Sequence, residues 1–104
     1  MKRDQVELWL IARRPERPFP LAVHMSECVQ QSVAEVEAAP TMAEAMGALG
    51  IATLRRVVAR KSSGERHAME LLAADAFVTY AFEAAAEEGS SVPPLVAELL
   101  QQAV

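Results

Sequence analysis

The longest stretch of this chain without glycine or proline covers residues 65–88, and it constrains the fold more than any other feature. Its sequence is ERHAMELLAADAFVTYAFEAAAEE. At ~100° per residue its apolar side chains spread almost all around a helix: Leu71, Val78 and Phe82 on one side, Met69, Leu72, Ala76 and Tyr80 on the next, and Phe77 beyond them. A helix that is apolar all round is normally buried. We therefore expect this helix at the centre of the fold, with the other segments packed on it.

Composition favours a single helical domain. A chain of 104 residues has the length of one domain, which we assign to 1–104. Leu, Ile, Val and Phe together number 26, a quarter of the chain, whereas disorder is typical below ~20%. Alanine is abundant and β-branched residues are too scattered for several strands. The sequence predicts an all-α fold, a compact bundle of four to five helices around the central apolar helix at about 65–88.

The N-terminal region is predicted to form a first helix over about 4–14. Asp4 and Glu7 have the spacing of a capping box, and the side chains that would share a face are Val6, Trp9, Leu10 and Arg13. The apolar residues over 5–12 also alternate, so a β-strand remains an alternative. Prolines at 15, 18 and 20 end this element. Residues 1–19 therefore form a helix or strand followed by a stiff proline-rich connector.

Two further helices are predicted before the central one. The second runs from Pro20 to about Ala39, with one apolar stripe made of Leu21, Met25, Val29, Val33 and Val36, and a polar opposite side. Pro40 ends it, and Thr41 with Glu44 forms a capping box for a third helix over 42 to about 61.

Glycine and serine positions bear on where these helices begin, end or pack closely. Gly47 and Gly50 each weaken the third helix by ~1 kcal/mol and indicate either a break or a close backbone approach. Ser62 and Glu65 have capping-box spacing at the start of the central helix, and Gly89 is a natural C′ residue at its end. A last helix at about 93–103 is too short to be stable alone, so it must dock.

Charge argues against nucleic acid as a partner. The net charge is −4 and the pI is about 5.1, so the chain as a whole does not attract phosphate backbones. The stretch TMAEAMGALGIATLRRVVARK has the order of a helix-turn-helix, but too few residues follow Gly50 for a turn and a second capped helix.

All ten Lys and Arg lie within 2–17 and 55–66, so the acidic segments need these blocks as neighbours. In particular, Glu83, Glu87 and Glu88 oppose the dipole of the central helix and call for a basic partner.

Location is inferred from cysteine content and hydropathy. The single cysteine, Cys28, excludes an internal disulfide framework and fits a reducing compartment. No run approaches the ~20 apolar residues of a membrane span, and the start lacks a cleavable leader pattern. We predict a cytoplasmic protein that does not enter a membrane.

Few residues of this sequence have a spacing typical of a metal site or a catalytic site. His24 and Cys28 are four residues apart on a helix and could reach one metal ion, but a closed zinc site needs two further ligands that the sequence does not offer at suitable spacing. No Ser-His-Asp set, phosphate loop, cysteine pair or carboxylate dyad occurs. We predict no metal, no cofactor and no catalytic residue, and the sequence does not favour an enzyme.

Asp75 is the most informative polar residue. Apolar faces flank it on the helical wheel, and a carboxylate there is costly unless it is paired. We expect a buried salt bridge to an arginine such as Arg56 or Arg13; exposure and a ligand-binding role are the alternatives.

These observations favour a non-enzymatic helical interaction module that associates with itself or with a helical partner, because short neighbouring helices cannot cover an all-apolar helix. The alternative is a small-ligand-binding protein or enzyme. Its pocket would lie between the central helix and the proline-rich segment, lined by Trp9, Phe19, His24, Asp75 and Tyr80.

Overall fold

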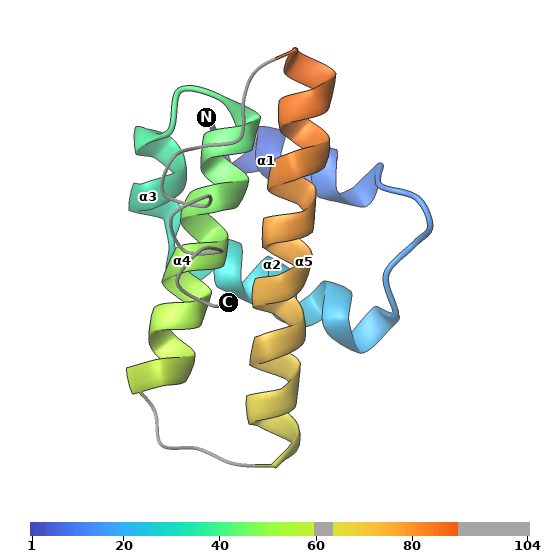
Figure 1. Ribbon diagram of the computed structural model, residues 1–104, viewed down its shortest axis with the longest axis vertical. Coiled ribbons are helices and arrows are strands. Elements are labelled where there is room, and N and C mark those ends of the chain that lie inside the picture. Colours follow the sequence, from blue (N-terminus) through green and yellow to red (C-terminus); the bar gives the residue numbers. More distant parts are fainter. Residues whose placement is uncertain (60–63, 90–104) are drawn as a thin grey trace.

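The computed structural model describes residues 1–59 and 64–89, in which all regular secondary structure is α-helical. The helices are α1 (Arg3–Ile11), α2 (Phe19–Gln31), α3 (Val33–Ala38), α4 (Met42–Ala59) and α5 (Glu65–Glu88). In Figure 1, α4 and α5 run antiparallel side by side, α1 and α2 cross behind them, and α3 lies beside α4. The predicted all-α bundle around a helix at 65–88 is confirmed.

The centre of the bundle is the interface between α4 and α5. Phe77 is fully buried, and the same side of α5 is otherwise lined mainly by alanines such as Ala73 and Ala81. Small side chains let the two helix backbones approach closely. A Cβ atom added to Gly50 would lie 3.1 Å from Val78 Cγ2. Since α4 is continuous through this position, Gly50 marks a close approach and not a break.

Helix α5 has the predicted bounds, and both of its ends are glycines. Gly64 precedes it with φ 88°, and Gly89 follows it in the left-handed conformation with φ 69°, as predicted for its C′ position. The predicted capping residue Ser62 lies outside the described residues, and so does the last predicted helix at 93–103.

The N-terminal element is a helix, so the alternative strand is wrong. Helix α1 begins at Arg3, and the Lys2 amide donates to Gln5 Oε1 at 3.1 Å. The predicted Asp4 capping box is also wrong, because Asp4 already lies within the first turn. Val6 and Leu10 are buried, as their predicted shared face requires.

Arginine side chains cap the other end of α1. Arg13 Nε donates to the Trp9 carbonyl at 3.2 Å, Arg14 Nη1 to Ile11 at 3.0 Å and Arg17 Nη2 to Leu10 at 3.1 Å. The Leu10 carbonyl also accepts from the Arg13 amide at 3.2 Å, and cations are favourable at this negative end of the helix dipole. The first basic block therefore has a local structural role.

The second predicted helix is two helices, which corrects the expectation of one element over 20–39. The break is at Ser32, which is buried and has φ −123° and ψ 33°. Its hydroxyl accepts a hydrogen bond from Arg56 Nη1 at 3.2 Å, so a long-range contact holds the non-helical residue in place. Val29 before the break and Val36 after it are both buried.

The start of α4 is capped from two sides. The Thr41 hydroxyl accepts from the Glu44 amide at 3.2 Å, which is one of the two hydrogen bonds of the predicted capping box. Glu88, at the end of the antiparallel α5, accepts from the Ala43 amide at 3.1 Å. An acidic group that opposes the dipole of α5 thus complements the dipole of α4.

Candidate functional site

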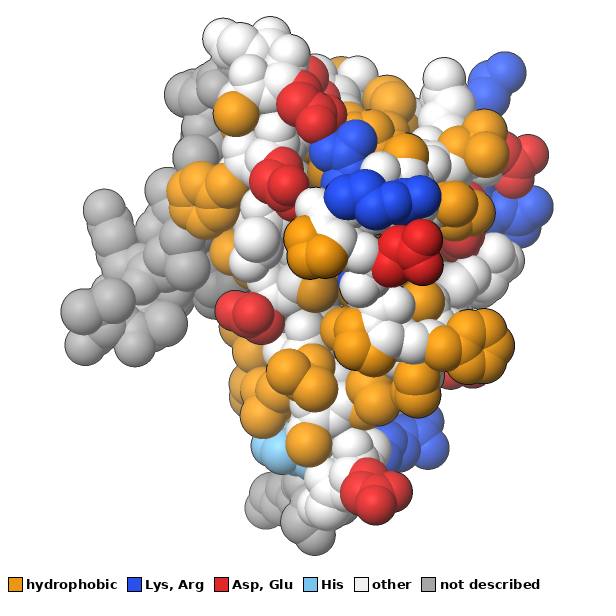
Figure 2. Space-filling view, turned by 90° about the vertical axis from the view of Figure 1, so that its right-hand side faces the viewer, with side chains coloured by type: hydrophobic (Ala, Val, Ile, Leu, Met, Phe, Trp, Pro, Cys, Tyr) orange, Lys and Arg blue, Asp and Glu red, His pale blue; other side chains and the backbone are white. Residues whose placement is uncertain are grey.

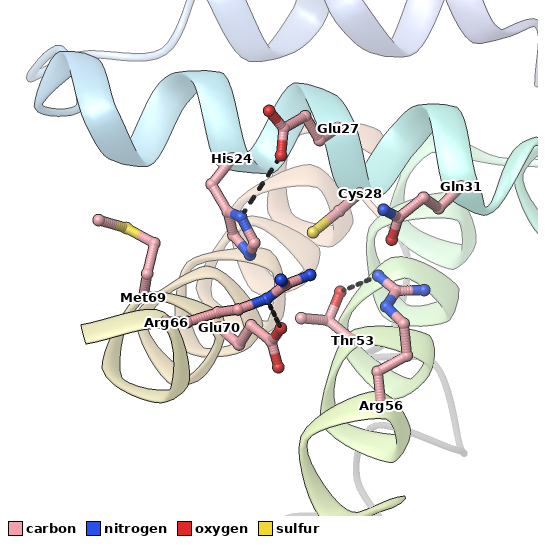
Figure 3. Close-up of a pocket in the computed structure, with 9 residues that line it drawn as sticks. All are labelled: His24, Glu27, Cys28, Gln31, Thr53, Arg56, Arg66, Met69 and Glu70. Atoms are coloured by element: carbon pink, nitrogen blue, oxygen red, sulfur yellow. Dashed lines mark hydrogen bonds and ion pairs between the residues drawn. The ribbon is translucent and has the colours of Figure 1, made fainter. Parts of the chain in front are cut away.

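A cavity of about 260 Å³ opens between α2, α4 and α5. Figure 3 shows α2 passing over it, with side chains of α4 and α5 directed toward α2. Its wall is formed by His24, Glu27, Cys28, Gln31, Thr53, Arg56, Arg66, Met69 and Glu70. Because polar and ionisable groups from three helices converge on one hollow, it is a candidate ligand site.

Arg56 reaches the cavity from the last turn of α4. Its Nη1 donates to the Ser32 hydroxyl and its Nη2 to the Thr53 hydroxyl, each at 3.2 Å. Both partners are neutral, and none of the carboxylates in the described residues forms an ion pair with this half-buried guanidinium. A guanidinium carries five N–H donors, so Arg56 keeps donors for a bound anion.

His24 enters the cavity from α2. Its Nδ1 lies 3.8 Å from Glu27 Oε2, whereas its Nε2 is buried and has no hydrogen-bond partner among residues 1–59 and 64–89. In Figure 3 the ring points toward the Arg66 guanidinium. Cys28, one turn later, is buried and lines the same hollow. In the part of the chain that the structure describes, no three His, Cys, Asp or Glu residues are grouped to hold a metal ion.

Glu70 is the buried carboxylate of the central helix, and the sequence interpretation missed it. It is 4% exposed, and Arg66 Nε donates to its Oε1 at 3.4 Å. Helical spacing could have indicated the burial of Glu70, because this residue lies seven positions before the buried Phe77 and therefore on the same side of α5.

The opposite side of α5 is exposed. Its uncovered large side chains are Leu71, Leu72 and Phe82, which are 42%, 54% and 41% exposed. Figure 2 shows hydrophobic side chains gathered across the face that contains this side of α5 and the start of α2. An exposed apolar face of this kind is typical of an interaction surface.

Asp75 lies on this exposed side, which corrects the expectation of a buried salt bridge to Arg56 or Arg13. Arg56 instead contacts Ser32 and Thr53, and Arg13 contacts Glu87. The reason is that the large neighbours which made the surroundings of Asp75 look apolar are themselves open to solvent.

Trp9 and Tyr80 form the contact between α1 and α5. Their rings meet edge to face with centroids 5.8 Å apart, and Arg13 stacks 3.8 Å from the centre of the Trp9 ring. Glu87 accepts from Trp9 Nε1 at 3.1 Å and from Arg13 Nη1 at 2.5 Å. The predicted basic partner for the acidic end of α5 is therefore Arg13 of the same chain.

The other predicted pocket residues lie elsewhere. Phe19 is 80% exposed and borders a different hollow of about 380 Å³ beside the proline-rich connector. His24 lines the cavity under α2, and Asp75 is exposed. Of the five residues, the structure brings only Trp9 and Tyr80 together, and neither lines one of these two hollows.

Two ionisable groups at the α1–α5 contact are perturbed. The hydrogen bond from Arg13 lowers the pKa of the Glu87 carboxyl, assisted by the bond from Trp9 and opposed by partial desolvation. Burial raises the pKa of the Tyr80 hydroxyl, and the positive charge of Arg17 opposes this shift.

Comparison with protein-family models, curated proteins and solved structures found no match for this chain. Among the described helices, none combines the length and hydropathy needed to cross a membrane.

Proposed function

We propose that this protein is a helical interaction module that self-associates through the exposed side of α5. The observation that carries the proposal is a stripe of solvent-exposed positions along the longest helix, made of Ala68, Leu72, Asp75, Thr79, Phe82 and Ala86. At 1.5 Å per residue the stripe is ~27 Å long. The free and buried Cys28 is compatible with the reducing cytoplasm proposed from the sequence.

The stripe is symmetric about the position of Phe77. Asp75 and Thr79 lie two residues from it, Leu72 and Phe82 five residues, and Ala68 and Ala86 nine residues. A two-fold symmetric interface requires that residue i of one copy contacts residue j of the other and the reverse. When two α5 helices pack antiparallel and cross at the position of Phe77, each stripe residue of one copy faces its symmetry-related residue in the other copy.

Each symmetric pair is chemically complementary. Leu72 would pack on Phe82 of the second copy, so the two large exposed apolar groups cover each other. The Asp75 carboxylate would accept a hydrogen bond from the hydroxyl of Thr79 of the second copy, which satisfies a polar group at the centre of the interface. Alanines at both ends permit close approach of the backbones.

Charge favours the same antiparallel arrangement. The C-terminal end of α5 carries Glu83, Glu87 and Glu88, whereas its first turn carries both Glu65 and Arg66. An antiparallel pair keeps the two acidic C-terminal ends apart and opposes the helix dipoles. A parallel pair would instead bring the two acidic ends together.

Sedimentation equilibrium and light scattering over a hundredfold concentration range test the proposal. We expect the unmodified chain to dimerise, and Leu72→Glu or Phe82→Glu to give monomers because each buries a carboxylate in an apolar contact. Ile11→Glu is the matched control, since Ile11 is 64% exposed on α1 and lies away from the stripe.

The register is tested by a double variant. Leu72→Glu combined with Phe82→Lys places a glutamate opposite a lysine twice across the antiparallel interface, and it should restore the dimer that Leu72→Glu alone loses. A chain that stays monomeric at every concentration would refute self-association. A dimer disrupted by the single variants but not restored by the double variant would refute only the register.

A further inference from the structure

We propose that the cavity between α2, α4 and α5 binds a small organic monocarboxylate, with Arg56 as its main anion-binding residue. This proposal does not depend on self-association, because none of the residues that line the cavity belongs to the exposed stripe of α5.

Among the described residues that line the cavity, Arg56 is the arginine that forms no ion pair with a carboxylate. The Arg66 guanidinium is offset by Glu70, with Nε and Oε1 3.4 Å apart. Glu27 Oε2 lies 3.8 Å from His24 Nδ1. Arg56 has only hydroxyl partners, although it is half-buried, and a partly desolvated cation without an anion is costly. A bound anion would remove this cost.

The same charges select a monoanion. Two carboxylates, Glu27 and Glu70, belong to the wall and would repel a second negative charge on the ligand. A singly charged carboxylate balances Arg56 alone. Its planar pair of oxygens also matches the guanidinium fork, which makes this pairing stronger and more specific than that with a spherical anion.

The remaining polar groups can hold a short ligand in place. The side-chain amide of Gln31 and the hydroxyl of Thr53 line the wall, and His24 presents its unpartnered Nε2. An imidazole with a proton on Nε2 would donate to a carboxylate or hydroxyl oxygen. A volume of about 260 Å³ suits a ligand smaller than most drug-sized molecules, such as a hydroxy acid of a few carbons.

The test uses lactate as the probe and its neutral analogue lactamide as the comparison, at constant ionic strength set with sodium chloride. Binding to the full chain is followed by NMR through the guanidinium Nε–Hε signals and the imidazole signals. We expect saturable shifts of the Arg56 and His24 signals with lactate, and no saturable shift with lactamide.

Arg56→Gln should weaken lactate binding by about tenfold or more, because it removes the charged fork and keeps a polar side chain. Arg55→Gln is the matched control: it removes the same charge from the adjacent, exposed position and should leave the affinity unchanged within about twofold. If Arg56→Gln proves unfolded by circular dichroism, His24→Gln serves instead and should weaken binding about threefold or more, the smaller loss expected from one hydrogen bond.

Three results would overturn the proposal. Shifts with lactate that never saturate, or that chloride reproduces, would show that no site exists. Equal losses with Arg55→Gln and Arg56→Gln would show diffuse attraction to a basic surface. Tighter binding of inorganic sulfate, a dianion at neutral pH, than of lactate would show that the cavity does not select a monoanion.

Discussion

A single carboxylate joins the first helix of the chain to the longest one. Glu87 of α5 is bound by Arg13 and Trp9 of α1, and Arg13 also lies on the face of the Trp9 ring. The acidic cluster that looked unfavourable for α5 thus provides the attachment point of α1. The two neighbouring carboxylates have different roles, since Glu88 caps α4.

The attachment predicts an acid-sensitive contact. The pKa of Glu87 is lowered in the folded chain by Arg13 and returns to its ordinary value on unfolding. The stabilisation is therefore complete above the ordinary glutamate pKa and is lost as the pH falls through the lowered folded value. Arg13→Gln should raise the Glu87 pKa toward the ordinary value, as measured by carbon-13 NMR titration of the carboxyl group.

Arg14→Gln is the control for this titration. Arg14 donates to the carbonyls of Ile11 and Arg13 and pairs with Glu16, so its loss should leave the Glu87 titration unchanged. A Glu87 pKa that does not respond to Arg13→Gln would contradict the assignment.

The two acidic residues in the first half of α5 show where sequence patterns mislead. The sequence pattern predicts that Asp75 is buried because large apolar residues flank it, and it leads to no such prediction for Glu70. The structure buries Glu70 and exposes Asp75. In a helix whose apolar residues are spread around the axis, the side that faces the core is the side where alanines let the neighbouring helices approach closely. Because alanine contributes little to a hydropathy pattern, this side is hard to recognise in the sequence.

The packing of α4 on α5 depends on Gly50, which predicts a steep cost of adding atoms there. A Cβ would stand 3.1 Å from Val78 Cγ2 and 3.5 Å from Phe77 Cβ. Gly50→Val should lower the free energy of unfolding by about 1–3 kcal/mol through overpacking. Gly50→Ala should cost less, because the higher helix propensity of alanine, ~1 kcal/mol, offsets the single tight contact.

Urea denaturation measures both effects. Ala59→Val, at an exposed position of the same helix, controls for the helix propensity of valine and should change stability by a few tenths of a kcal/mol. A Gly50→Val protein as stable as the unmodified chain would show that α4 and α5 can separate without penalty at this point.

Helices with long apolar stripes could be predicted from the sequence, and the division between α2 and α3 could not. The apolar residues keep their helical spacing across the division, at Leu21, Met25, Val29, Val33 and Val36. Serine at position 32 is a weak local signal. The contact that fixes the break is the hydrogen bond from Arg56, which is 24 residues away in the chain. Local patterns carry no information about such a partner.

The proposed association surface and the proposed ligand site lie on different sides of α5, which predicts that they act independently. Phe82 lies twelve residues from Glu70, ~18 Å along the helix. Phe82→Glu should therefore leave the lactate affinity within about twofold of the unmodified chain, measured by the same NMR titration. A tenfold change in affinity would instead indicate coupling between the two surfaces, since it is far outside the additive behaviour of distant sites.

The all-α architecture and the central helix followed from composition and from the run without glycine or proline. The candidate site did not. The sequence grouped Trp9, Phe19, His24, Asp75 and Tyr80, but the crossing of α1 and α2 over α4 and α5 directs His24 into a different cavity. Where helices cross depends on small side chains and arginine contacts between distant segments, and neither has a periodic pattern.

The edge-to-face contact of Trp9 and Tyr80 gives the chain a built-in optical reporter, because it has one tryptophan and one tyrosine. Excitation of the tyrosine should pass efficiently to the indole, so intrinsic fluorescence reads out whether α1 is seated on α5 and little else. Unfolding followed by emission alone would thus record the detachment of one short helix. Only an emission curve that coincides with the loss of ellipticity would establish that the bundle melts as one cooperative unit.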